Sequence, residues 1–218
     1  MHKIFKIMKL SVKILLMAAF MPFAAMAQEK TADEFKNEGN EFVRNKNYKA
    51  ALASFEQAIE LWGDSVDQAT VYNAADCARR TKQFDTAIKY YQKSVELNYK
   101  ADFSTYYIAD ILGDQGKDEE MEAVLVDGFA KYKIGKAAGV IKKSLAGYYV
   151  KKGAAIYNEG NNILGTSATA KPEEYASITA KAKEKFTEAK PWIEKALEVD
   201  ATNANALKVM EGLNEQLK

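Results

Sequence analysis

Histidine and cysteine are almost absent from this sequence of 218 residues. The only histidine is His2, close to the N-terminus, and the only cysteine is Cys77. Beyond residue 27 there is no histidine, so Ser-His-Asp and Cys-His catalytic arrangements and the common zinc sites are unavailable there. One cysteine cannot form an internal disulfide, and a free cysteine is usually buried, so we expect Cys77 to be buried on a helix. These absences favour a protein that is not an enzyme and binds no metal or other cofactor.

Proline and glycine are also scarce. The whole sequence contains three prolines and 12 glycines, and they are sparse between the expected turns. No glycine-rich phosphate loop is present, since Gly135, Gly139 and Gly147 lack the spacing of such loops. The carboxylate pairs 119–120 and 173–174 lie near expected helix starts, where negative charge is favourable at the positive end of the helix dipole. The apolar periodicity is helical throughout, and no strand pattern is found. We therefore expect an all-α protein.

The first 27 residues have the pattern of a secretory signal peptide. Four lysines and no acidic residue precede an apolar run over 14–25, which ends in the small-residue site Ala25-Met26-Ala27. This order of charge, apolar stretch and small residues is typical of a signal peptide, and the run is shorter than the roughly 20 apolar residues of a membrane span. The site has no cysteine, so a lipid anchor is not expected. We expect cleavage after Ala27 and a periplasmic or secreted protein, without a membrane span after cleavage.

Charge beyond the expected signal peptide is mixed and mildly acidic. Four of the 31 basic residues lie in the first 27 residues and none of the 30 acidic ones, which leaves 27 basic residues against 30 acidic ones. Nucleic-acid binding needs a clustered basic excess, so no nucleic-acid partner is expected. The same total predicts no polybasic patch for an anionic membrane surface.

Small and large apolar residues recur at intervals of about one helix hairpin. Equivalent positions in three successive segments are Ala51, Ala87 and Met121, which are 36 and 34 residues apart. The segments "NKNYKAALASFEQAIEL" and "TKQFDTAIKYYQKSVELN" share a small-x3-aromatic-x2-small spacing. Small residues at such positions let the two helices of a hairpin cross closely, and aromatic residues fill the gaps between hairpins.

The sequence resembles the tetratricopeptide repeat family. These two segments carry the clearest match, and the resemblance extends over nearly all of residues 32–218. The resemblance implies a right-handed superhelical array of antiparallel helix hairpins in a single domain, residues 28–218. It places three regular repeats at about 32–65, 68–101 and 102–135. Such arrays bind other proteins along a concave surface, so the implied function is protein or peptide binding by a scaffold of the cell envelope.

The fourth repeat departs from the pattern. A stretch without a repeat signature separates its two halves, and we interpret 137–200 as one extended hairpin with a loop at 165–171. Pro172 is then expected in the first turn of the second helix, and Pro191 is expected to kink that helix. Division of 137–200 into two ordinary repeats is the alternative, which the lack of turn residues between 143 and 153 disfavours. A terminal helix at 203–217 is expected to shield the end of the array.

The resemblance also implies which side chains face the concave groove, because the first helix of each repeat lines it. Arg and aromatic residues among them are typical binding anchors. From these positions we select as candidate partner-binding residues Lys36, Asn40, Arg44, Tyr72, Asp76, Arg79, Arg80, Phe103, Tyr106 and Asp110.

Two further hypotheses come from the same comparison. Some family members clamp a C-terminal carboxylate, and Lys36, Asn40 and Asn73 match three positions of that clamp. Its two basic positions are Phe103 and Tyr107 here, so the clamp is incomplete and loses its main attraction. The other hypothesis is a structural subunit of an envelope assembly that docks through the extended fourth hairpin, using the tyrosines at 148, 149, 157 and 175.

Overall fold

The computed structural model describes residues 29–218, and residues 32–218 form one compact unit. The expected signal peptide, residues 1–27, lies outside the described residues. Residues 29–218 contain helices, turns and short 3-10 segments but no strand, as expected for an all-α chain. Among the same residues, no helix is both long and apolar enough to cross a membrane.

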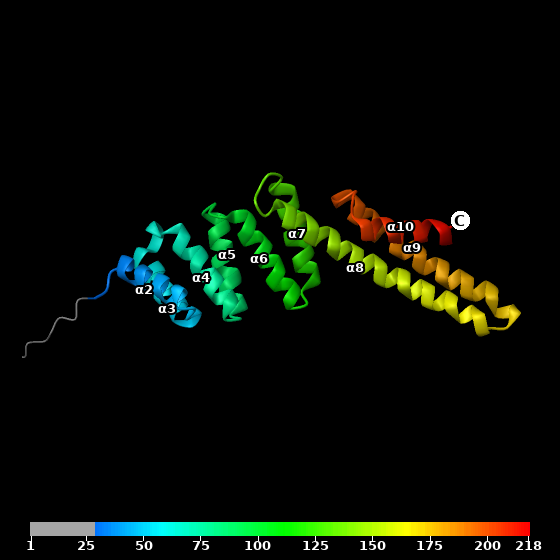
Figure 1. Ribbon diagram of the computed structural model, residues 1–218, viewed down its shortest axis with the longest axis horizontal. Helices are drawn as coiled ribbons and strands as arrows, with labels where there is room; N and C mark the ends of the chain where they lie inside the picture. The colour runs from blue at the N-terminus through cyan, green and yellow to red at the C-terminus, as the bar shows by residue number, and fades with distance from the viewer. Residues whose placement is uncertain (1–28) are drawn as a thin grey trace, which may run out of the picture. The chain divides into compact units, whose positions relative to one another are not determined.

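Six helices of ordinary length come first, and each packs against the next one along the chain (Figure 1). These helices are α2 (Ala32–Arg44), α3 (Tyr48–Trp62), α4 (Gln68–Arg80), α5 (Phe84–Glu96), α6 (Ala101–Asp114) and α7 (Asp118–Lys131). A one-turn 3-10 helix, η1 (Gly63–Ser65), follows α3. The six helices α2–α7 form three successive hairpins, which confirms the array of packed helix pairs expected from the sequence.

The same backbone turn closes the first helix of each of these hairpins. Lys46, Lys82 and Gly116 have positive φ angles of 58°, 59° and 72°. In each case the amide of that residue donates to the carbonyl three residues earlier, and the next amide donates to the carbonyl five residues earlier. This pattern is the Schellman motif, which satisfies the free carbonyls at a helix end. The first helix of each of the three hairpins therefore ends in the same way.

Close approach of the two helices within a hairpin depends on small residues. A Cβ at Gly39 would lie within 2.6 Å of two ring atoms of Phe55, which is itself fully buried. The long fourth hairpin repeats this contact, because a Cβ at Gly160 would lie 2.5 Å from the ring of Phe186. The glycine in the first helix therefore accommodates the aromatic residue of the second in both kinds of hairpin.

The fourth hairpin is a single unit of two long helices, α8 (Ala138–Gly165) and α9 (Tyr175–Val199). Two short 3-10 helices connect them, η2 (Thr166–Thr169) and η3 (Pro172–Glu174). Helix α10 (Ala204–Gln216) packs against both long helices.

Two expectations about prolines in this hairpin can be compared with the structure. Pro172 lies in η3, the short 3-10 helix that directly precedes α9, and not in the first turn of α9 itself, so that expectation was wrong. The reason is a local cap, in which the Glu174 side chain accepts a hydrogen bond from the Lys171 amide at 2.9 Å. Pro191 lies inside α9, as expected, and the helix is continuous there, while the expected kink stays a prediction.

The buried side chains form two clusters that meet at α6 and α7. One cluster joins α3–α6 and includes Phe55 and Tyr91, and the other joins α6–α10 and includes Leu125 and Phe186. Met121 of α7 packs against both clusters. Cys77 belongs to the first cluster, as expected, and burial raises the pKa of its thiol to about 12.

Candidate functional site

Helix α4 carries a compact group of charged side chains at its C-terminal end. Asp76 accepts hydrogen bonds from Arg79 Nη2 and from Arg80 Nε, each at 2.6 Å. Burial alone would raise the pKa of Asp76, but the hydrogen bonds from the two arginines outweigh it and hold that pKa below 3.8. Both arginines follow the aspartate by one helical turn, where they pair with it, and both lie near the negative end of the helix dipole, which favours their positive charges.

Tyrosine rings surround Arg79 on the adjoining helices. Arg79 Nε donates to Tyr91 Oη at 3.2 Å, and its guanidinium carbon lies 4.4 Å from the centre of the Tyr107 ring. Tyr107 stacks on Tyr91 at 5.4 Å between ring centres and contacts Tyr106 at 5.2 Å. These contacts join side chains from α4, α5 and α6 into one polar and aromatic layer.

Tyr72 extends this layer. Its ring meets the Tyr91 ring edge-on at 5.8 Å, and Lys100 Nζ lies 4.3 Å from its centre. Burial raises the pKa of Tyr72 to about 12. Tyr72, Asp76 and Arg79, all predicted from the sequence, therefore lie in one connected cluster.

The other predicted residues are placed less closely together. Lys36 forms an ion pair with Asp67 at 3.2 Å, next to the start of α4. Asn40 is half-buried and Arg44 is exposed on the same helix, α2. Arg80 lies over the Tyr48 ring of α3 at 4.9 Å. The half-buried Phe103 packs against the second core cluster, so most of its side chain serves packing.

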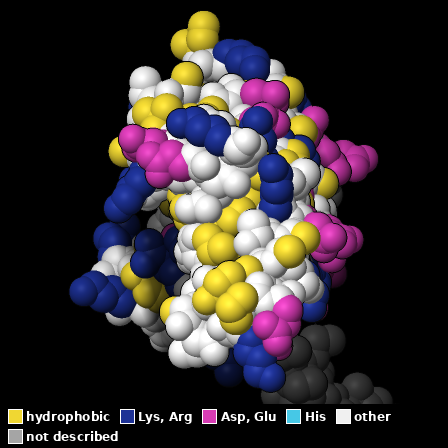
Figure 2. All heavy atoms as spheres, turned by 90° about the vertical axis from the view of Figure 1, so that its right-hand side faces the viewer, with side chains coloured by type: hydrophobic (Ala, Val, Ile, Leu, Met, Phe, Trp, Pro, Cys, Tyr) yellow, Lys and Arg dark blue, Asp and Glu magenta, His cyan; other side chains and the backbone are white. Residues whose placement is uncertain are grey.

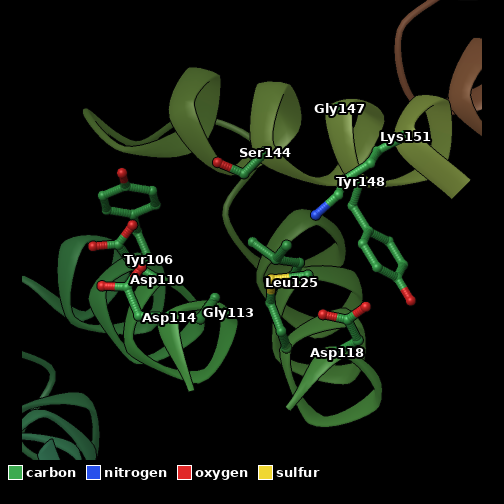
Figure 3. Close-up of a pocket in the computed structure, with 12 residues that line it drawn as sticks. Tyr106, Asp110, Gly113, Asp114, Asp118, Leu125, Ser144, Gly147, Tyr148 and Lys151 are labelled. Atoms are coloured by element: carbon green, nitrogen blue, oxygen red, sulfur yellow. The ribbon is translucent and has the colours of Figure 1, made fainter. Parts of the chain in front are cut away.

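A pocket of about 350 Å³ lies between α6, α7 and α8. The buried Leu125 forms its floor, Met121 also lines it, and its walls include Tyr106 and Tyr148. Figure 3 shows Leu125 between these two tyrosines. The remaining lining residues are Ala109, Asp110, Gly113, Asp114, Asp118, Ser144, Gly147 and Lys151. Tyr106 and Asp110, which were predicted as partner-binding residues, are thus two of the side chains that line this pocket.

Two carboxylates on the α6 side of the pocket have no basic partner. Asp110 and Asp114 are exposed, and no ion pair involves either of them within residues 29–218. Partial burial and the charge of Asp114 raise the pKa of Asp110 above 3.8. By contrast, Asp118 at the start of α7 pairs with Lys152 at 3.0 Å. The α6 wall therefore presents two carboxylates outside any ion pair of the described residues, although the positive charge of Arg79 acts on Asp110 and opposes part of the rise in its pKa.

The α8 wall was missed by the sequence analysis. Ser144, Gly147 and Lys151 follow one another at intervals of three and four residues, which places them on one face of a helix. Figure 3 shows the Lys151 side chain directed toward the pocket. Their spacing was the available signal, but the first helix of the fourth repeat was not assigned groove positions because its pattern is irregular.

Two of the four tyrosines expected to make the fourth hairpin a docking surface are not available for that role. Tyr148 and Tyr149 are buried, at 8% and 5% exposure, and pack around Trp192 of α9. Tyr157 is half-buried and Tyr175 is 45% exposed. Where this hairpin ends, hydrophobic side chains form small groups between charged ones (Figure 2).

The described residues on α4, α6 and α8 carry groups suited to non-covalent binding. No group of His, Cys, Asp and Glu side chains within residues 29–218 is arranged to hold a metal ion. This surface provides aromatic rings, a guanidinium over a ring, carboxylates in and outside ion pairs, and the pocket between α6, α7 and α8. These are the chemical features of non-covalent recognition.

Comparison with known proteins agrees with this architecture. Residues 69–100, which include helices α4 and α5, match the family model described as tetratricopeptide repeat. A TPR repeats protein from Bacteroides fragilis has the same fold, with a TM-score of 0.55 and 23% sequence identity over 84% of this chain and 98% of that chain. No curated protein matches the sequence.

Two more distant likenesses come from proteins with known ligands. One is YrrB, a TPR protein with an unusual peptide-binding site, at 15% identity over 84% of this chain and 94% of that chain. The other is the TPR2AB domain of yeast Sti1 in complex with pHSP90, at 21% identity over 84% and 83%. Both TM-scores are 0.41, too low to transfer a binding site. The fold is an all-helical array of packed helix pairs of the tetratricopeptide type, as the likeness to the Bacteroides fragilis structure shows.

Proposed function

We propose that this protein is a non-enzymatic scaffold of the cell envelope that binds a segment of a partner protein along the face formed by α4, α6 and α8. Arrays of this type mediate protein and peptide binding through such surfaces. The observation that carries the proposal is the pocket between α6, α7 and α8, because Tyr106 and Asp110 line it at positions where the family resemblance expects a ligand.

The pocket favours an anchor side chain with an apolar stem and a positive end. Leu125 and Met121 supply an apolar floor, while Asp110 and Asp114 supply negative charge at the α6 wall. Lysine and arginine side chains combine an aliphatic stem with a cationic head. Lys151 on the opposite wall can donate a hydrogen bond to a backbone carbonyl or an acidic group of the same segment. The proposed ligand is therefore an unfolded or helical segment that contains a basic residue.

The test fills the pocket without disturbing the fold. A Cβ at Gly147 would have no neighbour within 4 Å, so Gly147→Leu places a side chain in the pocket. Replacing glycine inside a helix also removes a cost of roughly 1 kcal/mol, so loss of binding would not reflect unfolding. Gly139→Leu is the matched control, because Gly139 lies on the same helix, has the same free space and does not line the pocket.

The measurement is affinity capture from a native envelope fraction with tagged wild-type and variant proteins. A partner captured by the wild type and by Gly139→Leu, but lost from Gly147→Leu, supports the proposal. A partner captured equally by all three proteins would place the contact outside this pocket.

The cell-envelope location in this proposal rests on the charge and apolar pattern of residues 1–27. We infer that the chain is cleaved after Ala27 and resides in the periplasm or outside the cell. N-terminal sequencing of the protein purified from its native cells is the test, with Gln28 expected as the first residue. An intact N-terminus in a cytoplasmic fraction would refute it.

A second candidate function is a structural subunit that docks through the extended hairpin. The favouring observation is Tyr175, which is 45% exposed at the start of α9. A photo-crosslinking residue placed at Tyr175 or at Tyr106 separates the two functions. Crosslinks from position 106 alone favour the groove, and crosslinks from position 175 alone favour the hairpin.

A further inference from the structure

Basic residues are concentrated in one part of the chain. Residues 128–158 contain seven lysines and no acidic residue, although the region beyond residue 27 is acidic in total. Two of the seven are used internally, since Lys142 pairs with Asp200 and Lys152 with Asp118, each at 3.0 Å. Lys151 lines the pocket. The other four are exposed and form no ion pair within the described residues, namely Lys131, Lys133, Lys136 and Lys143.

The loop that joins α7 to α8, residues 132–137, presents an isoleucine among these lysines. Ile134 is fully exposed at 101%, whereas the next most exposed large hydrophobic residue of the described chain, Leu61, is at 57%. Lys133 and Lys136 flank it, and Val140 at the start of α8 is 41% exposed. A single exposed hydrophobic residue is ordinary. A hydrophobic residue that is fully exposed at the tip of a loop, between two lysines outside any ion pair of the described residues, is less ordinary.

The loop is anchored at both ends. Tyr132 packs against the second core cluster, and Ala137 is fully buried. The Ala137 amide donates to Asp102 Oδ2 of α6 at 2.9 Å, and the same carboxylate would lie 2.6 Å from a Cβ at Gly135. Glycine at 135 therefore lets the loop approach α6 closely. The two ends of the loop are therefore fixed against the core and α6, and Ile134 between them is exposed to solvent.

We propose that this loop, with Ile134 at its tip, Lys133 and Lys136 beside it, and Lys131 and Lys143 on the adjoining helices α7 and α8, contacts the anionic surface of a lipid bilayer. Ile134 enters the interfacial region and the lysines contact lipid phosphates. This contact goes beyond the proposed groove function and does not depend on it. The total charge of the chain hid this patch from the sequence analysis, because acidic residues elsewhere offset the lysines.

Bilayer lipids suit this surface better than an acidic protein does. A protein partner would need a cavity shaped for Ile134 and carboxylates at four defined places. A bilayer offers an apolar phase under a layer of mobile phosphates, which adapts to any spacing of lysines. Asp102 of α6 is the carboxylate that contacts the loop, and it accepts hydrogen bonds from the backbone amides of Phe103 and Ala137 rather than pairing with a lysine.

The experiment measures co-sedimentation of residues 28–218, which contain the whole compact unit, with lipid vesicles. One vesicle is pure phosphatidylcholine, and the other contains a minority of phosphatidylglycerol. Binding is expected to the anionic vesicles only, and to weaken with added salt. The double variant Lys133→Gln/Lys136→Gln should bind about 25-fold more weakly, since each lysine near such a surface contributes roughly fivefold. Ile134→Ser should bind about tenfold more weakly through loss of the apolar contact.

Two matched controls distinguish this surface from general attraction. Leu207→Ser changes another exposed aliphatic residue, which is 49% exposed on α10, and Lys181→Gln/Lys183→Gln removes two exposed lysines of α9. Both should bind like the wild type. The proposal is overturned by no binding to anionic vesicles, by equal losses in the control variants, or by an Ile134→Ser variant that binds normally. It is also overturned if soluble polyaspartate binds with the same dependence on Ile134, which would indicate an acidic protein partner.

Discussion

Asp76 of α4 and Asp110 of α6 occupy equivalent places in adjacent repeats, 34 residues apart, yet their surroundings are opposite. Asp76 is held by two arginines at 2.6 Å each, and its pKa is lowered. Asp110 has no basic partner in the described chain, and its pKa is raised. The residues that follow explain the difference. One repeat has Arg79 and Arg80 where the next has Gly113 and Asp114.

The contrast indicates how one scaffold position can serve two purposes. At α4 the charges satisfy each other and stabilise the fold. At α6 two aspartates lie one turn apart at the C-terminal end of a helix, where the dipole and their mutual repulsion both disfavour them. An arrangement that costs stability and borders a pocket is consistent with selection for binding.

The largest effect is expected from Asp76→Ala. Removal of this carboxylate leaves Arg79 half-buried beneath Tyr107 without its charged partner, and we expect a loss of about 2 kcal/mol in the free energy of unfolding. Urea denaturation followed by circular dichroism measures it. Asp110→Ala is the matched control, and an equal loss in that variant would remove the distinction between the two repeats.

The pH dependence of stability should also differ between the two aspartates. The folded-state pKa of Asp76 is below 3.8, so its contribution is present above that pH and is lost as the pH falls through the lowered pKa. The stability difference between wild type and Asp76→Asn should therefore shrink on acidification below 3.8. For Asp110, whose pKa is raised, protonation favours the folded state instead. Urea midpoints across this pH range provide the measurement, and parallel curves for wild type and Asp76→Asn would contradict the expectation.

A smaller effect is expected when the α4 arrangement is transplanted into α6. Asp114→Arg places an arginine one turn after Asp110, as Arg80 follows Asp76. It also exchanges a negative for a positive charge at the end of the helix. We expect a gain of roughly 0.5–1 kcal/mol in unfolding free energy, with loss of partner capture. A more stable protein that still captures the partner would show that the α6 carboxylates are not needed for binding.

The smallest effect on stability is expected from Asp110→Asn. It removes one charge of a repelling pair, so the free energy of unfolding should rise by only a few tenths of a kcal/mol. Differential scanning calorimetry can detect such a shift in melting temperature. A clear loss of stability would reveal that Asp110 has a structural role.

The regular part of the fold was predictable because a local spacing decides it. Small residues at Gly39 and Ala51 are required wherever two helices cross closely, and the aromatic Phe55 fills the space beside them. The same chemistry recurs at Ala87 and Tyr91, so the sequence repeats visibly. The extended hairpin was recognised for the opposite reason, because the pattern stops and then resumes at Ala189.

Side-chain partners were much less predictable. Family positions placed Tyr72, Asp76, Arg79, Tyr106 and Asp110 on one surface, but which of them pair with each other depends on side-chain contacts across helices. The burial of Tyr148 and Tyr149 follows from packing against Trp192, more than 40 residues away in the sequence. No local pattern carries that information. The exposed Ile134 was overlooked for a similar reason, since only the structure shows that neither core cluster covers it.

The layer of tyrosine rings between α4 and α6 gives the protein an optical reporter. Tyr72, Tyr91, Tyr107 and Tyr106 are linked by ring contacts of 5.2–5.8 Å, close enough for their transitions to couple and produce a near-ultraviolet circular dichroism signal. Tyr106 at the end of this series also lines the pocket. Occupation of the groove would therefore change the protein's own spectrum, and a ligand could be titrated without attaching any dye.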